Sequence, residues 1–339
     1  MIRNKYVVLI LGLITLVAAV RVGLNYRLTA PGFDETCHVA AAVELVDHHT
    51  YALDPVHPPL SRLAMGIPLY FSGARFPDLP PNTPGMGDYN VVGNHILYDD
   101  GHFLRKLVVA RAVMLPFLAL LTLLVFLWTR RELGTLAGLV SAALFTTLPM
   151  VLAFSSLAYS DIPAATAQFA ALFAICNWLE KPLSWRGTLL LSLVVGAAFL
   201  TKFTSILYLF FGGAGMLLCR WLITRKPHGA TLERTTWQKH LGVAALTTLM
   251  VVWLGYGFSI GHVRETMQLS VNNIPSFQHF PGPVRSFARA VVVIKDPLVP
   301  APALLRGPSS VWVLNKSGTQ SYLLGKVKTE AGGTFFRLG

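Results

Sequence analysis

Charged residues are scarce in this sequence. Only 13% of its 339 residues are Asp, Glu, Lys or Arg, whereas 53% are hydrophobic, and the mean hydropathy is +0.55. A soluble domain is about one quarter charged. The composition therefore excludes an ordinary soluble domain and predicts an integral membrane protein.

Acidic residues are fewer than basic ones. The chain has 16 acidic against 28 basic residues, which gives a formal net charge of +12. Such an excess can indicate nucleic-acid binding, but the basic residues form no single patch. They stand at the ends of apolar runs, as the topology of a membrane protein requires. We therefore expect membrane lipids as partners and no nucleic acid.

Cysteine is rare and the common cofactor motifs are missing. The three cysteines lie far apart and predict no disulfide framework. No glycine-rich phosphate loop, dinucleotide fingerprint or nucleophile elbow occurs, so we expect no nucleotide cofactor. His48 and His49 are adjacent and cannot share a helix face, which argues against a structural zinc site. A divalent cation held by oxygens of Asp34 and Asp161 stays open as the metal alternative.

Seven apolar segments approach the roughly 20 residues that a membrane-spanning helix needs. They are 6–24, 108–128, 135–153, 162–179, 187–201, 204–222 and 241–260. The fold prediction is thus an all-α multi-pass membrane protein with about seven transmembrane helices. The first segment is interpreted as a retained signal-anchor, because no small-residue cleavage site precedes Arg21.

The basic residues predict the orientation in the membrane. If the N-terminus is cytoplasmic, the basic loops that flank the apolar segments all lie on the cytoplasmic side. Residues 25–103 and 261–339 then lie outside the cytoplasm. We therefore predict a transmembrane core over 1–260, which includes the external loop 25–103, and an external, irregular, proline-rich segment over 261–339. The predicted location is the plasma membrane, which is the inner membrane of a bacterial cell.

The external loop 25–103 concentrates titratable groups. It holds nine of the sixteen acidic residues and six of the ten histidines, which indicates chemistry rather than simple connection. Within it, residues 36–49 have apolar side chains at helical spacing and Glu44 on the opposite face. This pattern predicts a helix that lies on the membrane surface.

Three acidic residues stand at predicted membrane edges. Asp34 and Glu35 follow a Pro-Gly turn after the first segment, and Asp161 precedes Pro163 at the start of another. Acidic groups at such depths are often functional. The alternative is that they only complement the positive ends of helices, and for each residue taken alone this is the better explanation.

Three basic side chains are candidates for binding a phosphate. Lys202 lies between two apolar segments, Arg111 lies inside another, and His57 is held by the double proline that follows it. The simpler alternatives are that Lys202 and Arg111 extend to the membrane interface and that His57 is a surface residue in a turn.

In order along the chain, these residues resemble the motifs of membrane glycosyltransferases of the GT-C class. The resemblance is to the protein O-mannosyltransferases and lipid A aminoarabinose transferases, and it covers most of residues 1–260. The matching pieces are Phe33-Asp34-Glu35, His57-Pro58-Pro59-Leu60, Arg111, the segment 155–163 with Asp161, and the Leu-Thr-Lys that ends at Lys202.

The resemblance implies the transfer of a sugar from a polyprenyl-phosphate carrier to an extracytoplasmic acceptor. It makes Asp34, Glu35 and Asp161 the expected catalytic carboxylates, with Asp34 as the base or the group that orients the acceptor. His57, Arg111 and Lys202 are then the expected ligands of the carrier phosphate. Two departures from the pattern stand out. Val56 replaces a carboxylate that some relatives have before the basic-Pro-Pro element, and relatives continue with further helices. A truncated, non-catalytic membrane protein is therefore the alternative, and a transporter is a weaker one, because the charges lie at one edge.

Overall fold

A computed structural model describes residues 4–78, 89–180, 184–224, 234–263, 282–283, 296–317, 321–323 and 326–328 of the chain. The chain divides into two compact units, Met1–Val252 and Trp253–Gly339. All of the candidate site residues belong to the first unit.

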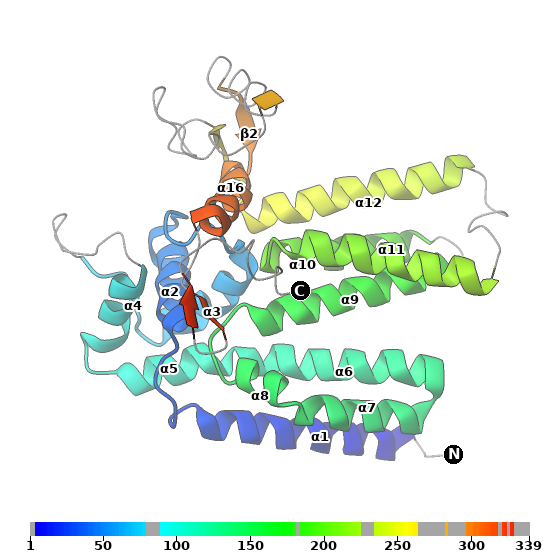
Figure 1. Cartoon of the computed structure of the whole chain (residues 1–339), viewed down its shortest axis with the longest axis horizontal. Helices are drawn as coiled ribbons and strands as arrows, with labels where there is room; N and C mark the ends of the chain where they lie inside the picture. Colours follow the sequence, from blue (N-terminus) through cyan, green and yellow to red (C-terminus); the bar gives the residue numbers. More distant parts are fainter. Residues whose placement is uncertain are drawn as a thin grey trace. The chain divides into compact units, whose positions relative to one another are not determined.

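The first unit is built from helices. Its longer helices are α1 (Asn4–Asn25), α6 (Met114–Leu133), α9 (Asp161–Glu180), α10 (Trp185–Thr201), α11 (Ser205–Thr224) and α12 (Arg234–Gly255), of which the last crosses the division between the units. The shorter ones are α2 (Phe33–Val43), the π-helical turn η1 (Glu44–His48), α3 (Pro59–Phe71), α4 (Tyr89–Tyr98), α5 (Phe103–Ala112), α7 (Thr135–Thr147) and α8 (Pro149–Ser155). Figure 1 shows α1, α6, α7 and α9 side by side, with α2, α3 and α4 gathered at one end of them.

Several helices have the length and composition of membrane spans. Among the described residues these are α1, the continuous stretch Phe103–Leu133 of α5 and α6, and α9. α7 and α8 make a fourth if they are one broken span, bent by 63°. The break lies at Leu148, which takes an extended conformation before Pro149, as a residue before proline tends to.

Each of the seven predicted apolar segments falls on helices of the structure, and three of them fall on α10, α11 and α12. The last segment, 241–260, runs past the end of α12 at Gly255. α10 is apolar but shorter than a full span, with 17 residues. The helical fold is therefore confirmed, whereas the number of seven spans stays a prediction.

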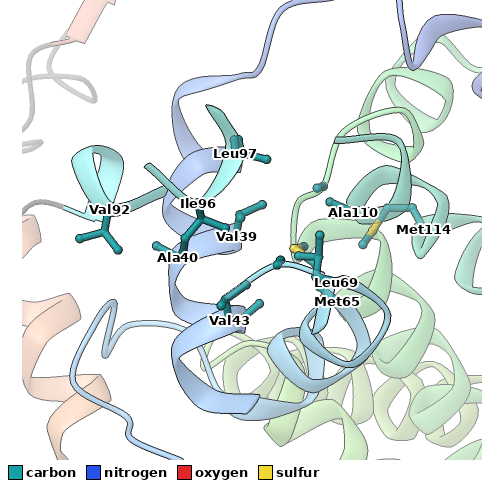
Figure 2. Packing of buried hydrophobic residues seen from close by; sticks show 13 residues of the cluster. Val39, Ala40, Val43, Met65, Leu69, Val92, Ile96, Leu97, Ala110 and Met114 are labelled. Carbon is teal, nitrogen blue, oxygen red and sulfur yellow. The ribbon is translucent and has the colours of Figure 1, made fainter. Parts of the chain in front are cut away.

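A compact core surrounds α2 at one end of the long helices. Figure 2 shows its apolar side chains in contact: Val39, Ala40 and Val43 of α2, Met65 and Leu69 of α3, Val92, Ile96 and Leu97 of α4, Ala110 of α5 and Met114 of α6. The helix predicted within 36–49 is therefore real, and it begins at Phe33. Its predicted place on the membrane surface was wrong, because α3 and α4 pack against it and its residues from Val39 to Val43 are all fully buried.

The described part of the second unit contains regular structure. Strand β1 (Ile260–His262) pairs antiparallel with β2 (Leu298–Pro300), helix α16 spans Pro302–Ser317, and β3 (Ser321–Leu323) pairs with β4 (Lys326–Lys328). The prediction of an irregular segment over 261–339 was therefore wrong in part. α16 starts at Pro302, where proline costs little because the N–H of a first helical residue has no acceptor within the helix. The helix also includes Pro308 in its interior.

Candidate active site at the ends of α2, α9 and α10

Arg111 and Glu35 form a fully buried ion pair between α5 and α2. Arg111 Nε donates to Glu35 Oε1 over 2.8 Å, and Nη2 donates to Oε2 over 2.7 Å. Both side chains are 0% exposed. The remaining guanidinium N–H groups donate to the carbonyl oxygens of Tyr26, Thr29 and Ala30. With all five of its donors engaged by protein groups, Arg111 has none left for a carrier phosphate.

Glu35 also joins two segments of the chain. Its Oε2 accepts the backbone N–H of Gly32 over 2.7 Å, and its Oε1 accepts that of Ala158 over 2.7 Å. The first contact satisfies an N–H group at the start of α2, as in a capping box. The second holds the segment that leads into α9. Glu35 therefore fixes the backbone on which neighbouring site residues stand.

Asp34 has a contrasting environment. It lies in the first turn of α2 and is exposed. Within the described parts of the chain, its carboxylate has no hydrogen bond or ion pair to a side chain. Of the two adjacent acids, Asp34 is the one that can reach a substrate.

Tyr159 lies beside Asp34. A Cβ on Gly32 would lie 2.3 Å from the Tyr159 hydroxyl oxygen, so glycine at this position is what lets the phenol approach the start of α2. Burial raises the pKa of Tyr159 above its usual value, and the carboxylates of Asp34 and Glu35 raise it further. The hydroxyl therefore stays protonated and can donate to a ligand next to Asp34.

Asp161 and Lys202 meet at the edge of the long helices. Asp161 is the first residue of α9, and Lys202 follows the last residue of α10. Lys202 Nζ donates to Asp161 Oδ1 over 2.8 Å, and the two side chains stay 29% and 40% exposed, respectively. This pair is thus accessible, unlike the pair of Glu35 and Arg111.

Asp54 and two histidines form a further cluster. His57 Nδ1 lies 2.9 Å from Asp54 Oδ2, and His38 Nδ1 lies 3.8 Å from the same oxygen. Asp54 is 3% exposed and takes the left-handed backbone conformation, with φ of +46°. Arg62 holds this backbone by donating to the carbonyl oxygens of Leu53 and Asp54.

The loop that carries Asp54 is fixed to η1 by Glu44. This buried carboxylate accepts the backbone N–H groups of Ala52 and Leu53 over 2.9 and 3.0 Å. Buried polar groups are normally satisfied by hydrogen bonds, and this carboxylate spends its acceptors on the loop backbone. Glu44 therefore connects the loop to η1. It holds Asp54 and His57 in place against α2.

The cluster lies next to the other site residues. The rings of His38 and His57 are 4.7 Å apart between centroids, and those of His38 and Tyr159 are 5.8 Å apart. The pKa of His38 is lowered to about 3, mainly by burial and next by His57, while the charges of Asp54 and Asp161 act in the opposite direction. His38 is therefore neutral at physiological pH and within electrostatic reach of Asp161.

The six predicted residues fall into two groups. Asp34, His57, Asp161 and Lys202 are exposed or partly exposed, and the charge of Asp161 acts on both His38 and Tyr159. Glu35 and Arg111 lie buried behind them as a structural pair.

Three residues of the site were missed from the sequence: His38, Asp54 and Tyr159. Their spacing carries a signal, because His38 lies one helical turn after Asp34, Asp54 lies three residues before His57, and Tyr159 lies two residues before Asp161.

A comparison with known families bears on this arrangement. Residues 103–255 match the dolichyl-phosphate-mannose-protein mannosyltransferase family. The match confirms the family resemblance over this segment, which includes Arg111, Asp161 and Lys202. Asp34 and His57 lie outside it, and their link to the family rests on the motifs. No curated protein matches the chain.

The mannosyltransferase match agrees with the helical fold. The family consists of membrane glycosyltransferases of the GT-C type, and the chain has apolar helices of the length that spans a membrane. The matched segment runs from the start of α5 to the end of α12. It therefore supplies the membrane helices that position Asp161 and Lys202.

Proposed function

We propose that this protein transfers a sugar from a polyprenyl-phosphate carrier to an acceptor on the extracytoplasmic side of the plasma membrane, either a protein hydroxyl or a lipid. The observation that carries the proposal is the accessible group of Asp34, Tyr159, Asp161 and Lys202 at one end of the helices. The family match over α5 to α12 supports the class of reaction.

In this proposal, Asp34 is the general base. The acceptor oxygen attacks the anomeric carbon, Asp34 takes the acceptor's proton, and the bond from that carbon to the phosphate oxygen breaks with its electron pair. The transition state has oxocarbenium character, as in glycoside hydrolysis. An exposed carboxylate at the start of a helix is suited to this role, and positioned acid–base catalysis contributes about 100- to 10,000-fold in rate.

Lys202 and His57 stabilise the leaving phosphate. An ammonium group has three N–H donors, so Lys202 can contact the phosphate while it keeps its hydrogen bond to Asp161. Asp161 thereby orients the lysine. Positive charge fixed beside the leaving group is the electrostatic stabilisation that this reaction needs. Glu35 and Arg111 act only by positioning Asp34 and the segment before α9.

The proposal is tested with Asp34→Asn in nanodiscs that contain a polyprenyl-phosphate mannose as donor and membrane extract as acceptor. We expect wild type to transfer mannose, Asp34→Asn to lose at least about 100-fold of the rate, and donor binding to persist. Asp78→Asn is the matched control, because Asp78 is also an exposed acid of the predicted external loop. Transfer by Asp34→Asn at the rate of this control would exclude Asp34 as the base.

A further inference from the structure

We infer that His38, Asp54 and His57 bind a divalent transition-metal ion such as Zn²⁺. Each residue offers one ligand atom, and the three atoms lie within 4.8 Å of one another. This site differs from the oxygen-ligated cation between Asp34 and Asp161 that the sequence left open.

The distances fit a tetrahedral centre. Zn²⁺ binds nitrogen and oxygen at about 2.0–2.2 Å, so neighbouring ligand atoms of a tetrahedral site lie about 3.3–3.6 Å apart. The separations from Asp54 Oδ2 to His57 Nδ1 and His38 Nδ1 are 2.9 and 3.8 Å, values on either side of that range. Both separations thus lie within about half an ångström of the tetrahedral range, and the two histidine ligand atoms lie within 4.8 Å of each other.

The ligands are also chemically prepared for a metal. His38 is buried on α2, and imidazole nitrogen is a ligand that Zn²⁺ commonly takes in proteins. Asp54 is buried and brings a negative charge. The contacts of its backbone with Arg62, and those of the loop with Glu44, hold the aspartate against α2. Such support around a ligand is typical of metal sites.

The ligand set selects the kind of ion. Two imidazoles and one carboxylate suit Zn²⁺ and related first-row ions, whereas Mg²⁺ and Ca²⁺ prefer oxygen ligands. Three protein ligands leave a fourth position for water or a substrate oxygen. The alternative is that Asp54 only accepts a hydrogen bond from His57 and pairs with Arg62, whose Nη2 lies 3.9 Å from its carboxylate.

Metal binding is measured on the full chain, without a polyhistidine tag, after treatment with a chelator. We expect the protein in detergent to bind one Zn²⁺ per chain and to show the visible absorption of tetrahedral Co²⁺, with no competition from Mg²⁺. A wild-type protein that binds neither Zn²⁺ nor Co²⁺ would overturn the inference. This measurement involves no sugar transfer, so it stands or fails independently of the proposed function.

Variants then locate the ion. Loss of an outer partner of a metal site costs about 10- to 100-fold in affinity, so His38→Gln and His57→Gln should each cost at least 100-fold. His95→Gln is the matched control, because His95 forms an equally short contact with Asp99, 2.9 Å, on the surface. If His38→Gln does not fold, the partly exposed His57 carries the test. Unchanged affinity in His57→Gln would place the ion elsewhere and refute the site.

Discussion

At the scale of single residues, the adjacent acids Asp34 and Glu35 have opposite environments. One is exposed with no side-chain partner among the described residues, and the other is fully buried with four donors. A buried ion pair is strongly destabilising when one partner is removed, because the other charge is left uncompensated. The two residues should therefore respond differently to the same chemical change.

We predict that Glu35→Gln lowers the free energy of unfolding by about 3–5 kcal/mol, because Arg111 is left as a buried charge without a counter-ion. Asp34→Asn should change it by less than about 0.5 kcal/mol, as surface substitutions do. Denaturant titration of both variants in detergent gives the comparison. Equal stabilities for the two variants would contradict the structural role of the buried pair.

At the scale of elements, the close packing of α3 against α2 positions the helix that carries Asp34 and His38. α3 approaches α2 at Gly66, where an added Cβ would lie 2.3 Å from the carbonyl oxygen of Ala42. The atom in the way belongs to the backbone of a helix and cannot rotate aside. The side-chain size at position 66 therefore decides how near the two helices lie.

We predict that Gly66→Ala destabilises the protein by about 1–3 kcal/mol, the usual cost of overpacking, and lowers sugar transfer by displacing α2. Gly12→Ala is the control within another helix, since nothing lies within 4 Å of a Cβ at that position. Alanine there should be neutral or stabilise by up to about 1 kcal/mol. Thermal unfolding of both variants checks the prediction, and a stable Gly66→Ala variant would show that α2 and α3 can separate at no cost.

At the scale of the whole molecule, the orientation in the membrane decides which compartment the site faces. Asp34, Asp161 and Lys202 lie at the ends of helices where the chain enters or leaves the apolar segments. The basic residues of the connecting loops predict that this end is extracytoplasmic. An orientation with the site in the cytoplasm would remove the proposed access to an external acceptor.

We predict that Ser72→Cys, after α3, reacts with a membrane-impermeant thiol reagent in intact cells, whereas Leu133→Cys, at the end of α6, reacts only after permeabilisation. Leu133 is 75% exposed, so its failure to react in intact cells would not reflect burial. The background chain carries serine at Cys37, Cys176 and Cys219. The opposite labelling pattern would place the site on the cytoplasmic side and refute the proposed acceptor.

The sequence by itself determined the helical fold with its long apolar helices, and it placed the candidate site residues at the ends of those helices. Long apolar runs leave a chain few alternatives to helices, and the prolines and acids at their ends mark the helix starts at Phe33 and Asp161. The motifs also predicted the family that matches over 103–255. These features are local in the chain, so composition and spacing are enough to find them.

Only the tertiary structure decided which of the candidate polar side chains are buried and which stay exposed. Glu35 pairs with Arg111, 76 residues away, and a neighbour so distant in sequence leaves no trace in local spacing. The burial of α2 against α3 and α4 also depends on segments distant in sequence, so the local pattern of α2 does not reveal it. The cluster of His38, Asp54 and His57 likewise joins α2 to a loop that Glu44 holds, and Asp54 takes a left-handed backbone conformation there that local spacing does not predict.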